Sequence, residues 1–177
     1  MGSIIKVFKF GGASVKDAEA VRNIPNILSH YPDEALVIVL SAMGKTTNHL
    51  ESLVDAYYHS SDKKVDILKD ISTYHSNITH ELFENSKHPV HAEVNLLLRK
   101  LESTIIAGRE KAFNLKPSFD FIYDQIVPYG ELLSTTIVSY YLNEHGCRNQ
   151  WYDVRQLIRT DDSYREGSVD WDFTQAR

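Results

Sequence analysis

The chain has 177 residues, of which 42% are hydrophobic and 24% are charged, so it is long enough for one domain with a sizeable core. Its formal net charge of -5 and the lack of a basic block argue against nucleic acid as the main partner. The longest apolar run, 35–40, is too short to span a membrane, and the first residues do not form a signal peptide. Because Cys147 is the only cysteine, an internal disulfide is excluded, and we expect a cytoplasmic protein.

The first predicted element is a strand over 4–10 that leads through two glycines into a helix over 17–28. β-Branched and aromatic residues favour the strand. The helix is indicated by apolar residues at helical spacing, which are Ala18, Val21, Ile24 and Leu28. Pro25 is expected to kink this helix or to make its second half irregular.

The turn between these elements is a candidate phosphate site. Gly11 and Gly12 let backbone N–H groups approach a ligand that a side chain would block, and the following helix start adds a partial positive charge. Lys9 can place a full charge at the same point, and Ser14 adds a hydroxyl group. From the residues alone, a tight strand–helix turn with Lys9 in solvent is an equally good interpretation.

A second strand is predicted over 35–40, and its continuous apolar run is typical of a parallel strand that is buried on both faces. Strand, helix and strand in succession predict a parallel pair with a right-handed crossover. The second strand ends in a loop over 41–48 that is rich in small and polar residues. Since parallel strands end at the same edge of a sheet, the two loops are expected to form one site.

The rest of the chain is predicted to be mainly helical. Residues 62–116 indicate a long helical hairpin inserted between sheet elements, and further helices are expected over 119–127 and from Glu131 to Gly146. A third strand is predicted over 147–152. Six of the eight histidines lie between His49 and His91, and a solvated face is the better interpretation of them than a metal-ligand set.

Four segments resemble those of the aspartate kinase family. Lys9–Val15 reads K-F-G-G-A-S-V and is similar to the family's opening K-F-G-G-T-S-V. Val39–Asn48 resembles the second motif, Tyr129–Ser134 resembles a G-E-x-x-S run, and a fourth block covers Trp151–Arg155 with Arg159–Asp162. Four motifs in the right order over most of the chain make a specific signal, whereas one alone would be weak.

This resemblance implies the amino-acid kinase fold, an α/β three-layer αβα sandwich. It implies transfer of the γ-phosphoryl group of ATP, with Mg²⁺, to the β-carboxylate of L-aspartate, the first step towards lysine, threonine and methionine. Lys9 would be catalytic and would hold the phosphoryl oxygens together with Gly11, Gly12 and Ser14. Ala13 replaces the usual threonine, for which we expect a modest effect.

The resemblance also assigns the amino-acid substrate to named residues. Ser41 and Thr47 would hydrogen-bond L-aspartate, and Glu131 would pair with its α-ammonium group. Without the family, Glu131 reads as an ordinary acidic residue in a first helical turn. We assign no catalytic role to Arg159 or Asp162, because an Arg–Asp pair in a polar turn is usually structural.

The family's later G-R-G-G-S-D motif, its second nucleotide-binding segment and its ACT domains do not occur in this sequence. We therefore expect residues 1–177 to be the N-terminal portion of an amino-acid kinase domain, inactive alone, with an unpaired sheet edge that favours homo-oligomers. Two alternatives stay open. One is a different amino-acid kinase family member, and the other is a non-catalytic lobe that binds an amino acid or phosphate.

Overall fold

The computed structural model describes residues 5–111 and 117–177. Residue 4 of the first predicted strand and residues 112–116 of the predicted helical region lie outside these ranges. Two parallel strands, β1 (Ile5–Phe10) and β2 (Ala35–Leu40), pair in register from Ile5 beside Ala35 to Phe10 beside Leu40. Helix α1 (Ala18–Leu28) connects them, so the predicted βαβ unit is confirmed.

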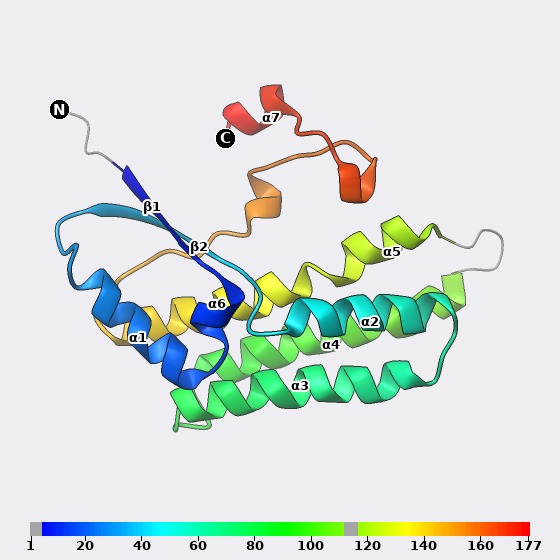
Figure 1. Ribbon diagram of the computed structural model, residues 1–177, viewed down its shortest axis with the longest axis horizontal. Coiled ribbons are helices and arrows are strands. Elements are labelled where there is room, and N and C mark those ends of the chain that lie inside the picture. Colours follow the sequence, from blue (N-terminus) through cyan, green and yellow to red (C-terminus); the bar gives the residue numbers. More distant parts are fainter. Residues whose placement is uncertain (1–4, 112–116) are drawn as a thin grey trace.

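The remaining elements are mainly helices, as predicted. They are α2 (Thr46–Tyr58), α3 (Lys63–Leu82), α4 (Pro89–Lys111), α5 (Phe119–Ile126), α6 (Tyr129–Glu144) and the short α7 (Trp171–Gln175). Figure 1 shows α3 and α4 running side by side as a long hairpin, with the segment after α6 extending away from it to α7. The predicted α/β class and the helical hairpin are therefore both observed.

Two clusters of buried apolar side chains hold these elements together. The first joins the inner sheet face to α1, α6 and the adjoining ends of α3 and α4, with Val21, Ile24 and Leu133 fully buried or nearly so. The second joins α2 and α5 to the other end of the hairpin, around Leu53 and Leu101. The hairpin spans both clusters, so it fixes α2 relative to the sheet.

The other face of the two-stranded sheet is exposed and, apart from Lys9, apolar. Ile5, Val7, Val37 and Val39 are 61%, 64%, 47% and 45% exposed. The apolar run over 35–40 suggested a strand buried on both faces, but within the described residues only the inner face is covered. No helix in 5–111 or 117–177 is both long and apolar enough to cross a membrane.

Two local predictions are wrong, and a third is wrong in part. Residues 147–152 form no strand, because Asn149 and Trp151 bond to Ser139 and Thr135 of α6 instead of to a neighbouring strand. Helix α6 begins at Tyr129 rather than at Glu131. Helix α1 continues through Pro25 without an irregular second half, since its buried face of Val21, Ile24 and Leu28 packs on both sides of the proline. The predicted kink at Pro25 stays a prediction.

The prediction that the histidines between His49 and His91 share one solvated face is wrong. His75 is fully buried, and His88 stacks on Phe83 at 4.6 Å and pairs with Glu144 at 2.8 Å. His91 Nε2 lies 3.2 Å from the carbonyl oxygen of Phe83. These three side chains serve packing and hydrogen bonding within the hairpin region.

Candidate functional site

The loops that follow β1 and β2 are joined by backbone hydrogen bonds. The Ser41 N–H donates to the carbonyl of Phe10 at 3.0 Å, and the Gly44 N–H donates to the carbonyl of Gly12 at 3.0 Å. The two predicted ligand loops therefore form one continuous surface at the carboxyl edge of the sheet, where parallel α/β sheets bind ligands.

Gly12 is required by this close approach. A Cβ atom at Gly12 would lie 2.8 Å from the carbonyl oxygen of Ala42 and 3.0 Å from that of Gly44. Both contacts are to backbone, which cannot move aside cheaply. By contrast, a Cβ at Gly11 would meet only Lys9 Nζ, at 3.7 Å. Gly12 therefore has a structural role, and Gly11 faces the side on which the lysine lies.

Lys9 places a cation at the end of β1, beside the glycine turn, while the exposed Lys45 lies on the second loop. The Lys9 side chain is exposed, and within the described residues it makes no ion pair or hydrogen bond. The 3₁₀ turn η1 (Gly12–Val15) begins beside it, and no described group accepts the N–H of Gly12 or Ala13. The N–H of Ser14 is used by the carbonyl of Gly11 at 2.9 Å, so Ser14 offers only its exposed hydroxyl. A free ammonium group beside open N–H donors is suited to an anion.

Helix α6 brings Glu131 to the second loop. Glu131 Oε1 accepts the N–H of Ala42 at 3.2 Å, and Ser134 Oγ donates to the carbonyl of Ser41 at 2.7 Å. Gly130 makes this approach possible, because a Cβ there would lie 2.8 Å from the Cβ of Ala42. The structure thus places a carboxylate, predicted only through the family resemblance, directly against the loop that contains Ser41.

Thr47 lies in the first turn of α2, at the end of the same loop, and is half-buried. The structure therefore brings all the predicted site residues to the carboxyl edge of the sheet: Lys9, Gly11, Gly12 and Ser14 on one loop, Ser41 and Thr47 on the next, and Glu131 beside the second loop. Among these predicted residues, the cationic Lys9 lies on the first loop and the carboxylate of Glu131 lies against the second.

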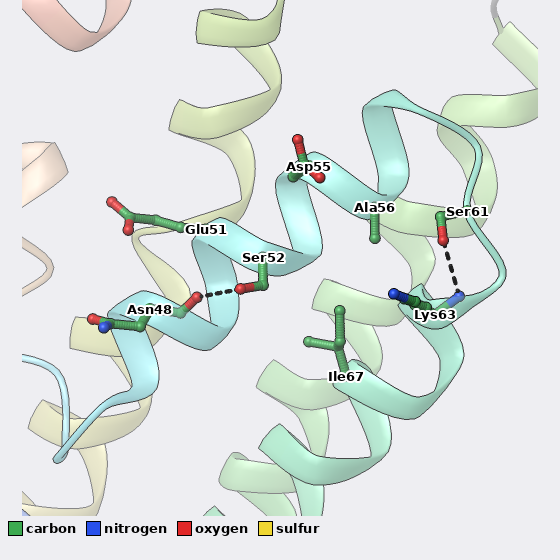
Figure 2. A pocket seen from close by; sticks show the side chains of 8 residues that line it. All are labelled: Asn48, Glu51, Ser52, Asp55, Ala56, Ser61, Lys63 and Ile67. Atoms are coloured by element: carbon green, nitrogen blue, oxygen red, sulfur yellow. Dashed lines mark hydrogen bonds between the residues drawn. The ribbon is translucent and has the colours of Figure 1, made fainter.

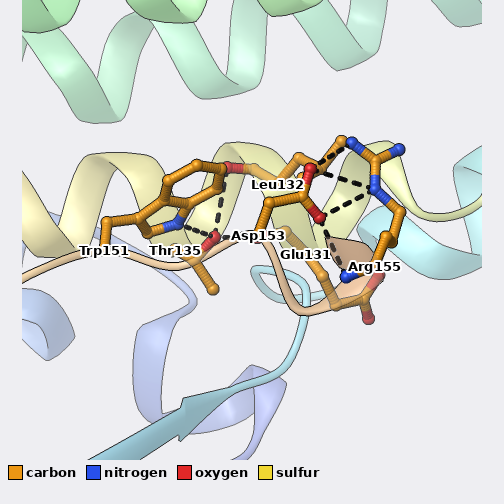
Figure 3. A network of polar contacts seen from close by, with 6 residues as sticks. All are labelled: Glu131, Leu132, Thr135, Trp151, Asp153 and Arg155. Carbon is orange, nitrogen blue, oxygen red and sulfur yellow. Dashed lines mark hydrogen bonds and ion pairs between the residues drawn. The ribbon is translucent and has the colours of Figure 1, made fainter. Parts of the chain in front are cut away.

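The first part of the fourth motif block, Trp151–Arg155, lies beside the start of α6 (Figure 3). Trp151 Nε1 donates to Thr135 Oγ1 at 2.9 Å, and Thr135 Oγ1 donates to the carbonyl of Glu131 at 2.7 Å. Arg155 donates two hydrogen bonds to the carboxylate of Asp153, from Nε to Oδ1 at 2.9 Å and from Nη2 to Oδ2 at 2.6 Å. The hydrogen bonds from Arg155 hold the pKa of Asp153 below its usual range, so this pair stays ionised and fixes the local chain path.

A separate hollow of about 590 Å³ lies between α2 and the start of α3 (Figure 2). Asn48, Glu51, Asp55 and Lys63 are among the residues that line it, and none of the predicted site residues does. Across residues 5–111 and 117–177, no group of three or more His, Cys, Asp or Glu side chains is arranged to hold a metal ion. Because none of the predicted site residues lines the hollow, it is not part of the candidate site.

Two side chains near the loops were not predicted as part of the site. The Tyr74 hydroxyl donates to the carbonyl of Lys16, and His75 Nε2 lies 3.4 Å from Thr46 Oγ1. Both belong to α3, far from the loops in sequence. The one signal available was that His75 falls on the apolar stripe of its helix, between Ile71 and Ile78.

The chain resembles known proteins over most of its length. Residues 5–172 match the amino acid kinase family, and the chain belongs to that family. Within it, the chain is similar to aspartokinases. It is 33% identical to aspartokinase 2, chloroplastic, of Arabidopsis thaliana over 162 residues, which cover 88% of this chain and 28% of the relative. It is 30% identical to the lysine-sensitive aspartokinase 3 of Escherichia coli over 171 residues, which cover 95% of this chain and 35% of the relative.

The chain is also similar to aspartokinases in solved structures. The chain superposes on E. coli aspartokinase III in complex with lysine and aspartate with a TM-score of 0.80 at 27% identity. This match covers 98% of the chain and 36% of the neighbour. The same enzyme in complex with aspartate and ADP gives a TM-score of 0.79. The predicted amino-acid kinase fold is therefore confirmed. The chain spans about a third of the length of these relatives.

Proposed function

We propose that this chain is the N-terminal portion of the catalytic domain of an aspartate kinase. The reaction transfers the γ-phosphoryl group of ATP to the β-carboxylate of L-aspartate and yields 4-phospho-L-aspartate, the first step towards lysine, threonine and methionine. The observation that carries the proposal is the joining of the glycine turn to the Ser41 loop, with Lys9 on one side and Glu131 on the other. E. coli aspartokinase III, whose structures contain aspartate and ADP, has this fold.

The glycine turn would serve the phosphates of ATP. Lys9 would neutralise charge on the transferring phosphoryl group, while the N–H groups of Gly11 and Gly12 and the hydroxyl of Ser14 would bind its oxygens. Since phosphoryl transfer depends mainly on positioning and charge neutralisation, a lysine without an internal partner is well suited to it. Mg²⁺ would bind mainly through the ATP phosphates, because the described residues offer no cluster of metal ligands.

The second loop and α6 would serve L-aspartate. Hydroxyl groups of Ser41 and Thr47 would bind its polar groups. The Oε1 atom of Glu131 is used by the Ala42 N–H, and its Oε2 atom has no partner among the described residues, so it can accept from the substrate ammonium group. The charge then orients the substrate with its β-carboxylate towards Lys9.

Replacement of Glu131 tests this assignment. In Glu131→Gln the amide oxygen still accepts the Ala42 N–H, but the charge that would pair with the substrate is lost. We expect KM for L-aspartate to rise about 10- to 100-fold, because hydrogen bonds to charged groups contribute about 1.5–3 kcal/mol. KM for ATP should stay unchanged. The measurement is steady-state kinetics on the longest gene product that contains this chain.

The matched control is Glu144→Gln, at the other end of the same helix, where the carboxylate pairs with His88. It should leave KM for L-aspartate unchanged. An equal rise in both variants, or none in Glu131→Gln, would show that Glu131 does not bind the substrate.

The exposed sheet face should drive self-association of residues 1–177. Val7 and Val37 are neighbours on this face and more than 40% exposed, and an apolar strand face beside an unpaired edge is prone to association. We expect light scattering to give a mass of a dimer or larger at high concentration, reduced in Val7→Thr/Val37→Thr. The control Val65→Thr, at an isolated position that is 64% exposed on α3, should not change it. A monodisperse wild-type monomer would contradict this expectation.

A cytoplasmic location stays a prediction, because the plant relatives are named as chloroplastic.

A further inference from the structure

Two consecutive residues of the hairpin contact both loops of the candidate site. The Tyr74 hydroxyl donates to the carbonyl of Lys16, which follows the glycine turn. The His75 ring lies against Thr46, the first residue of α2, which follows the Ser41 loop. Adjacent side chains of one helix thus hold the ends of two segments that are separated in sequence.

Tyr74 also lies against the point where the loops meet. A Cβ on Gly44 would lie 2.6 Å from Tyr74 Oη, and Gly44 has a φ of +54°, which favours glycine. The N–H of Gly44 bonds to the carbonyl of Gly12. A continuous set of contacts therefore runs from Tyr74 through Gly44 to the glycine turn that contains Gly12.

His75 is held in one orientation. Its Nδ1 atom lies 2.7 Å from the carbonyl oxygen of Ile71, so Nδ1 carries the proton and Nε2 can accept from the Thr46 hydroxyl. Burial lowers the pKa of His75 to about 4, with His49 of α2 adding to the effect, so the ring is neutral near pH 7. A neutral, fixed imidazole suits a bracing role, and its full burial keeps it away from substrate.

We propose that Tyr74 and His75 are positioning residues that set the spacing between the phosphate-binding turn and the amino-acid-binding loop. This inference rests on the proposed function for its kinetic consequences. His75 contacts Thr46, which precedes Thr47 in the sequence. We therefore expect His75 to affect the binding of L-aspartate. The contacts of Tyr74 are to Lys16 and Gly44, so it acts on the nucleotide side.

The test uses Tyr74→Phe, His75→Leu and the conservative His75→Gln, in the longest gene product that contains this chain. We expect His75→Leu to raise KM for L-aspartate about 10-fold with KM for ATP unchanged, because a small displacement of a binding group is costly. His75→Gln keeps a polar group near Thr46 and should restore most of the loss. Tyr74→Phe should lower kcat about 3- to 10-fold.

Controls come from the same region. His80→Leu removes an exposed histidine that makes the same bond to the carbonyl four residues earlier, at 2.7 Å from Ser76, and it should leave both KM values unchanged. Tyr140→Phe removes a hydroxyl farther along α6 and should leave kcat unchanged. Equal effects in variants and controls, or unchanged kinetics in Tyr74→Phe and His75→Leu, would overturn the inference.

Amide hydrogen exchange on residues 1–177 tests the bracing without an enzyme assay. We expect Tyr74→Phe to speed exchange in 12–17 and 42–46 at least about 10-fold while the buried part of α4 keeps its protection. If the gene product does not phosphorylate L-aspartate but this local change occurs, the proposed function fails and the bracing stands. Should exchange in both segments match the wild type, the bracing is wrong even in an active enzyme.

Discussion

Lys9→Met should lower kcat for phosphoryl transfer by about 10²- to 10³-fold, the usual cost of removing one group that neutralises charge in a transition state. The ammonium group of Lys9 has no partner among the described residues, so its loss disturbs no internal ion pair. We expect the melting temperature of the variant to match that of the wild type. Steady-state kinetics and thermal unfolding on the same preparation check both parts.

Lys6→Met is the matched control for this variant. Lys6 lies on the same strand but on the opposite face, where it pairs with Glu34 at 2.5 Å, and such exposed pairs contribute about 0–1 kcal/mol. Its loss should leave kcat unchanged. If Lys9→Met lowers kcat by less than about fivefold, Lys9 is not catalytic, because removing a group that neutralises charge in the transition state should cost far more.

Gly12→Ala should destabilise the folded chain by about 1–3 kcal/mol, the usual cost of overpacking. The added methyl group would meet the carbonyl oxygens of Ala42 and Gly44 at 2.8 and 3.0 Å and push the two loops apart. For a chain of this size, thermal unfolding should show a decrease in melting temperature of roughly 3–10 °C. Binding of both substrates should weaken as well, because the loops form one surface.

Gly11→Ala separates stability from ligand binding. Gly11 has a φ of -75°, which alanine adopts without strain, and the new methyl group would touch only Lys9 Nζ. The melting temperature should stay level or rise slightly, while phosphoryl transfer slows because the lysine is crowded. If Gly11→Ala and Gly12→Ala melt alike, the close approach at Gly12 is not what holds the loops together.

The local elements near the sheet could be predicted because their patterns are strong. The apolar spacing of Val21, Ile24 and Leu28 and the apolar run over 35–40 defined a βαβ unit, and parallel pairing then fixed where both loops lie. The same reasoning failed at 147–152. That segment was predicted to be a strand, but Trp151 and Asn149 bond to α6, and such tertiary contacts override a strand propensity.

Only part of the candidate site could be predicted from the sequence. Local chemistry made Lys9, Gly11 and Gly12 candidates for a phosphate site but left a plain strand–helix turn equally good, whereas the proposed role of Glu131 needed the family resemblance. The structure adds the physical reason for the position of Glu131, since Gly130 lets α6 approach Ala42 closely enough for Glu131 to accept a hydrogen bond from the Ala42 N–H. Tyr74 and His75 could not be predicted as site neighbours, because their contacts depend on how the hairpin packs against the loops.

The most direct test of the account is an NMR titration of isotope-labelled residues 1–177 with L-aspartate and, separately, with ATP and Mg²⁺. We predict that L-aspartate shifts the amide signals of 41–47 and Glu131, that ATP shifts those of 11–14, and that D-aspartate shifts neither set. Absence of shifts in both sets, or shifts confined to the hollow between α2 and α3, would contradict the claim that the two loops form one substrate site.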